Sequence, residues 1–150
     1  MKIEIPAFLK VIRALPQDKL DYKPHEKNTS AGALAWQVAT EMATLPELLE
    51  SGIINYGGYG DPPSVEEMAT KLETAANQVV ERAGSVSDEQ WNGPGKFLYM
   101  GNPVWEATVS DLAWGFLLDM IHHRGQLSAY LRPMGGKVPA IYGPSGDEKS

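Results

Sequence analysis

Residues 114–132, WGFLLDMIHHRGQLSAYLR, restrict the fold more than any other stretch, because apolar side chains at helical spacing surround nearly every side of it. A helix of this kind is central in its fold or covered by a second copy of the chain. At about 100° of rotation per residue, Asp119 and His123 lie in one apolar sector, one turn apart. Two side chains at this spacing can bind one metal ion. His122 projects roughly a quarter turn away, toward a partly exposed or supporting position.

Helical patterns dominate the rest of the chain, and no segment shows the period-2 alternation of a strand. Helices are expected over 6–15, 30–49 and 64–83, and from a start between Val104 and Asp111 to about Arg132. Ser64 followed by Glu67 gives the clearest start, a capping box in which each residue binds the other's backbone N–H.

Gly and Pro interrupt the helical patterns twice: residues 52–63, GIINYGGYGDPP, are expected to form a loop, and the chain from Gly135 onward a non-helical tail. We therefore predict the all-α class, with one helix-bundle domain over residues 1–150. The core-facing positions of such bundles commonly hold a metal or a ligand.

The composition excludes several classes of function. A formal net charge of -6 disfavours binding to nucleic-acid phosphates, which requires clustered Lys and Arg. The chain has no Cys, so thiolate metal sites, disulfides and a cysteine nucleophile are excluded. No run approaches the roughly 20 apolar residues of a membrane-spanning helix, and the N-terminus lacks a signal-peptide cleavage pattern. We expect a cytoplasmic protein that binds neither nucleic acid nor membrane.

A second pair of polar side chains, Gln37 and Glu41, lies one turn apart in the second predicted helix. Glu41 falls inside the apolar sector, where an unpaired carboxylate is costly and needs a partner. Two interpretations stay open: a metal site shared with Asp119 and His123, or a metal-free arrangement. In the second, Glu41 or Asp119 pairs with Arg124 or His123, and Gln37 is hydrogen-bonded across the bundle. Arg124 is also expected to tie helices together through carboxylates or backbone carbonyls, which its planar fork suits.

Two segments resemble a known family: residues 15–39, LPQDKLDYKPHEKNTSAGALAWQVA, and residues 122–143, HHRGQLSAYLRPMGGKVPAIYG. They are similar to the DinB/YfiT-like superfamily of small bacterial four-helix bundles. The resemblance implies an up-down-down-up bundle that holds a divalent metal through three histidines, one from the second helix and two from the fourth. The matching positions here are Gln37, Asp119 and His123, of which only His123 keeps the imidazole.

An altered set of this kind leaves three expectations open. The site is retained with a changed metal preference and help from Glu41, or it binds metal weakly, or a hydrogen-bonded network of Gln37, Asp119 and His123 replaces the metal. Oxygen ligands favour harder ions over a tight zinc site, and an amide oxygen is unusual for zinc. Zinc, nickel, manganese and iron are the divalent candidates.

The resemblance also implies an activity. Relatives include thiol S-transferases and thiol-dependent isomerases, in which the metal lowers the pKa of a low-molecular-weight thiol such as bacillithiol or mycothiol. We expect either a metal-dependent transferase or hydrolase-type enzyme acting on a small molecule in the bundle cleft, with Glu41 or His122 transferring protons, or a noncatalytic ligand-binding or stress-associated bundle that has lost the metal. The apolar fourth helix and the family both suggest a homodimer.

Overall fold

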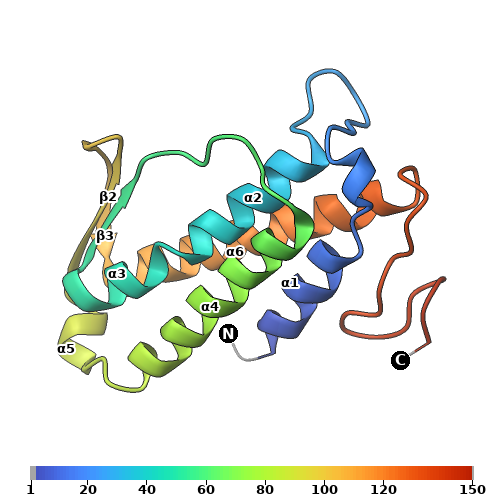
Figure 1. Cartoon of the computed structure of the whole chain (residues 1–150). Helices are drawn as coiled ribbons and strands as arrows, with labels where there is room; N and C mark the ends of the chain where they lie inside the picture. The colour runs from blue at the N-terminus through green and yellow to red at the C-terminus, as the bar shows by residue number, and fades with distance from the viewer. Residues whose placement is uncertain (1–2, 150) are drawn as a thin grey trace.

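The computed structural model describes residues 3–149, and its long helices pack side by side (Figure 1). These are α1 (Glu4–Arg13), α2 (Ala31–Met42), α4 (Val65–Ala83) and α6 (Val109–Leu131). The Ser64 capping box is confirmed, since its hydroxyl accepts from the Glu67 N–H and the Glu67 side chain accepts from the Ser64 N–H. Ser30 and Thr108 cap α2 and α6 through their hydroxyl groups.

The shorter elements lie between these helices. They are the 3-10 helix η1 (Gln17–Lys19), α3 (Leu45–Ser51), β1 (Ile53–Tyr56), α5 (Asp88–Trp91), β2 (Pro94–Tyr99) and β3 (Asn102–Thr108). None of the helices within residues 3–149 combines the length and the apolar character that a membrane crossing requires.

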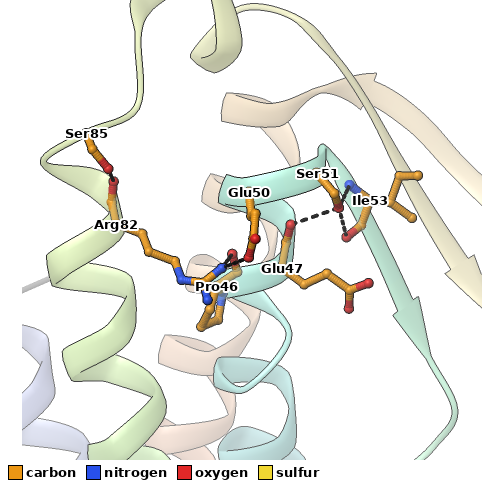
Figure 2. A network of polar contacts seen from close by, with 7 residues as sticks. All are labelled: Pro46, Glu47, Glu50, Ser51, Ile53, Arg82 and Ser85. Atoms are coloured by element: carbon orange, nitrogen blue, oxygen red, sulfur yellow. Dashed lines mark hydrogen bonds and ion pairs between the residues drawn. The ribbon is translucent and has the colours of Figure 1, made fainter.

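The prediction of one helix over 30–49 is wrong, because α2 ends at Met42 and α3 begins at Leu45. Pro46 lies in the first turn of α3, where its missing N–H is harmless, whereas inside a continuous helix it would clash with the preceding turn. Figure 2 shows Arg82 of α4 reaching this segment, where it donates to the backbone oxygen of Pro46 at 3.0 Å and to the carboxylate of Glu50.

The all-α class is also wrong, because a three-stranded sheet of order β1-β2-β3 lies at the end of the bundle near α3 and α5 (Figure 1). β1 pairs with β2 in parallel and β2 with β3 antiparallel, so part of the expected loop 52–63 is a strand. Met100 and Gly101, with φ of 51° and 80°, form the two-residue turn between β2 and β3. Positive φ at both central residues gives the twist that a tight hairpin needs.

A continuous apolar core joins α1, α2, α3, α4 and α6, and Ile54 brings β1 into it. Described residues 133–149 contain neither helix nor strand and run along α1 at the other end of the bundle (Figure 1). Arg124 of α6 is buried and, as expected, ties elements together: it donates to Glu4 of α1 at 2.5 Å and to the Tyr142 hydroxyl of the tail at 2.5 Å.

Candidate functional site

The packing of α2 against α6 brings Gln37, Glu41, Asp119 and His123 together. Gln37 Nε2 lies 2.8 Å from Glu41 Oε1 and 3.1 Å from His123 Nε2, and His123 Nε2 lies 3.1 Å from Asp119 Oδ2. One ligand atom from each of Glu41, Asp119 and His123 lies within 4.8 Å of the others. These three residues, called the acidic triad below, could hold a metal ion.

Glu41 is the buried member of the acidic triad, with 6% of its surface exposed. Burial, and to a smaller extent the neighbouring Asp119 carboxylate, raise the pKa of Glu41 to about 7, against the lowering effects of the Gln37 hydrogen bond and His123. Among residues 3–149, Glu41 Oε2 has no hydrogen-bond partner. An unsatisfied buried carboxylate oxygen is costly, and a cation would satisfy it.

The hydrogen bonds of His123 determine which of its ring nitrogens faces the other two members of the acidic triad, Glu41 and Asp119. Gln126 Nε2 lies 3.1 Å from His122 Nε2 and Gln126 Oε1 lies 3.0 Å from His123 Nδ1. An amide nitrogen donates and an amide oxygen accepts, so this arrangement assigns the proton of neutral His123 to Nδ1. The Nε2 lone pair then faces the Asp119 carboxylate, an arrangement suited to a shared cation. Metal-binding histidines commonly donate their other N–H in this way.

The structure places some of the predicted site residues at the acidic triad and others outside it. Gln37, predicted to offer its oxygen, contacts Glu41 and His123 through its amide nitrogen. Glu41, predicted as a helper and a candidate for proton transfer, lies within the acidic triad. His122 is exposed and bonds to Gln126, so it lies outside the triad.

A cleft of about 440 Å³ opens beside the acidic triad. Gln37, Glu41 and Asp119 contribute polar groups to its lining. Gly115 and six aromatic residues supply the rest: Tyr56, Tyr59, Phe97, Phe116, Tyr99 and Trp105. These six residues are called the aromatic wall below, and most of them lie in the strands and in the loop after β1, segments that carry no predicted site residue. The alternation of aromatic residues in β2 and the tyrosines of the Gly-rich segment were the signals that could have indicated it.

Gly115 allows the aromatic wall to approach α6 closely. A Cβ atom added at Gly115 would lie 2.7 Å from Cη2 of Trp105, closer than carbon atoms pack. The absence of a side chain at this position therefore sets the position of the Trp105 ring at the cleft.

Comparisons with known proteins agree on the fold. The DinB family model matches residues 106–149, which include Asp119 and His123. A DinB-like protein from Bacillus cereus ATCC 10987 has a similar structure, with a TM-score of 0.73, 22% sequence identity, and coverage of 94% of this chain and 92% of that chain. This chain has a DinB-like fold. The expected resemblance to the DinB/YfiT-like superfamily is confirmed for the fold and for the sequence of residues 106–149.

Two further proteins that this chain is similar to come from Bacillus subtilis. The DinB-like protein YjoA has a TM-score of 0.70 at 20% identity, with 92% of each chain covered. "Uncharacterized protein YrdA" of strain 168 is 22% identical over 151 residues, which cover 98% of this chain and 86% of YrdA. The DinB-like fold of this chain therefore combines the helices with a mixed three-stranded sheet, and the predicted all-α class is wrong.

Proposed function

We propose that this DinB-like protein binds a divalent metal ion through Glu41, Asp119 and His123 and acts on a small molecule held in the neighbouring cleft. The observation that carries the proposal is Glu41 Oε2, a buried carboxylate oxygen without a hydrogen-bond partner in the described chain, beside two further ligand atoms. Two carboxylates would neutralise a doubly charged ion, so the charge of the acidic triad fits this class of ligand.

The chemistry of the donors favours particular ions. One imidazole nitrogen and two carboxylate oxygens suit manganese or iron, and they are also acceptable to zinc and nickel. Gln37 donates to Glu41 and would hold that carboxylate in place. Gln126 would fix the tautomer of His123 from the opposite side of the ring.

A bound divalent metal would supply Lewis acidity, which lowers the pKa of a thiol or of water at neutral pH. The chain's own residues supply the surroundings. Burial and the Glu41 charge raise the pKa of Tyr56 to about 12, against the effect of its hydrogen bond with Thr40, so the phenol stays protonated. Tyr56 Oη lies 2.9 Å from Thr40 Oγ1 and lines the cleft, where it can orient a substrate. A thiol transfer or a hydrolysis fits these groups, with a low-molecular-weight thiol as one cosubstrate.

A noncatalytic ligand-binding protein is the second candidate, and one observation favours it. Glu41, Gln37, His123, Gln126 and His122 form a continuous chain of hydrogen-bond contacts that needs no metal to connect its members. In this form the cleft would still bind a small molecule, without the Lewis acid that a reaction requires.

Metal analysis separates the two candidates. The protein is purified without a chelator or a metal-affinity tag, and binding of Mn²⁺, Zn²⁺ and Ni²⁺ is measured by calorimetry. Near-stoichiometric binding that is lost in Asp119→Asn and His123→Ala supports the metal site. His25→Ala, at an exposed position in the loop before α2, is the matched control and should bind metal normally. Failure of all three metals to bind the wild type would refute the metal-dependent enzyme.

A further inference from the structure

The aromatic wall of the cleft is more than a lining for a metal site. The Tyr56 and Tyr99 rings lie 6.4 Å apart with an interplanar angle of 36°, and Phe97 packs edge-on against Phe116 at 5.1 Å. Tyr99 is 46% exposed and Trp105 40% exposed, although both line the cleft. Large aromatic side chains that are exposed to solvent beside a cleft are stabilised when a ligand covers them. They therefore indicate a binding surface.

The charge of the cleft is entirely negative. Glu41 and Asp119 contribute two carboxylates, while no Lys, Arg or His of the described residues belongs to its lining. Lys96 lies in β2 next to Phe97, but successive strand residues face opposite sides of a sheet, and Lys96 pairs with Glu106 at 3.1 Å. In the metal-free protein, an anionic group inside the cleft would therefore face carboxyl groups without a compensating cation.

A second observation concerns a single buried atom and does not depend on the clustering of acidic residues. The Oε2 atom of Glu41 is buried, lacks a hydrogen-bond partner within residues 3–149, and belongs to a residue that lines the cleft. A ligand that enters from the aromatic side and carries positive charge would reach a polar group that the protein itself does not satisfy.

We propose that the cleft binds a compound that carries a flat aromatic group and a positively charged nitrogen, and that it excludes anionic groups from the space between the aromatic walls. Tyr and Trp faces attract organic cations, and the ring of the ligand would be covered by Tyr99 and Trp105. This inference rests on the proposed function only in taking this cleft as the substrate site. It concerns the metal-free protein, because a metal ion and a ligand cation would compete for Glu41.

The test uses three probes of similar size and different charge, benzyltrimethylammonium, benzyl alcohol and benzoate, added to metal-free protein. Binding is followed by calorimetry and by tryptophan fluorescence. A cation held against aromatic faces gains about 1–2 kcal/mol, so the ammonium probe should bind roughly 5 to 30 times as tightly as benzyl alcohol. Benzoate should not bind. Equal binding of the alcohol or the benzoate, or no binding of the ammonium probe, would overturn the proposal.

Three variants locate the binding. Trp105→Ala should weaken binding of the ammonium probe about tenfold, and Gly115→Ala should weaken it by displacing the same ring. Val104→Ala, at an exposed neighbouring position outside the cleft lining, is the control and should leave the affinity unchanged. An equal loss in Val104→Ala and Trp105→Ala would also refute the proposed site. Circular dichroism and thermal unfolding confirm that each variant is folded.

The outcomes also separate this inference from the metal proposal. Binding of benzyltrimethylammonium by a protein that binds none of the divalent metals would refute the metal site and support the aromatic cleft. Metal binding without binding of the ammonium probe would support the metal site and refute the cleft proposal.

Discussion

Replacing Glu41 by Gln tests the electrostatics of the site most directly. Burial raises the pKa of this carboxyl from 4.5 to about 7. Each pKa unit corresponds to about 1.4 kcal/mol, so keeping Glu41 ionised inside the fold costs about 3 kcal/mol. Little solvent screening reduces this figure, because only 6% of the residue is exposed. Gln has nearly the same shape, and its oxygen can still accept from Gln37.

The sign of the pH effect on the free energy of unfolding follows from the raised pKa of Glu41. Between the ordinary pKa of 4.5 and the folded-state value of about 7, the folded state binds more protons than the unfolded state. The free energy of unfolding therefore falls as pH rises through this window, and the full cost is present above pH 7. Glu41→Gln removes the cost, so its stability relative to wild type should increase by about 2.5 kcal/mol between pH 5 and pH 8.

Urea unfolding of wild type and Glu41→Gln at pH 5 and pH 8, in the presence of EDTA, measures this difference. Titrating groups that do not contact Glu41 contribute equally to both proteins and cancel. Glu47→Gln, at an exposed position of α3, is the control and should follow wild type at both pH values. If wild type and Glu41→Gln show the same change between pH 5 and pH 8, the reasoning about burial of Glu41 is wrong.

Three more predictions address other parts of the molecule. Arg124→Met should lower the free energy of unfolding by about 3 kcal/mol, measured with urea, because Glu4 loses its buried partner. Gln126→Leu should weaken Mn²⁺ or Zn²⁺ binding about 10-fold to 100-fold in calorimetry, because His123 loses the acceptor for its Nδ1 proton. Trp114 and Leu118 are exposed on α6, and we expect them to form a homodimer contact. Sedimentation should show a dimer that Leu118→Glu converts to monomer, and wild-type monomer at micromolar concentration would contradict this.

The helices could be predicted because their signals are local. The Ser64 capping box fixes the start of α4 within a few residues, and the apolar spacing of α6 places Asp119 and His123 together before any tertiary contact is known. The break at Pro46 had a local signal as well, a proline within an apolar run, which the prediction of a single helix passed over.

The sheet could not be predicted in the same way, because its strands depend on partners. β1 has four residues, of which Ile54 alone is buried, so its alternation is too short to distinguish from a loop. β2 begins at Pro94 and β3 contains Pro103, residues that argue against a central strand. Pairing between β1 and β2 and packing on α6 decide the outcome, and neither interaction can be derived from the composition of a single segment.

The candidate site contains parts of both kinds: helices, which local sequence signals predict, and strands, which depend on their pairing partners. The acidic triad lies on α2 and α6, whose packed core holds the ligand atoms in place. Much of the aromatic wall lies on the sheet, and it meets α6 where Trp105 covers Gly115. Substitutions in β2 or β3 should therefore change which small molecule binds and leave metal affinity unaffected, whereas substitutions in the triad should change metal affinity first. Relatives that share the DinB-like helices and differ in these strands would then bind different ligands with the same metal-binding positions.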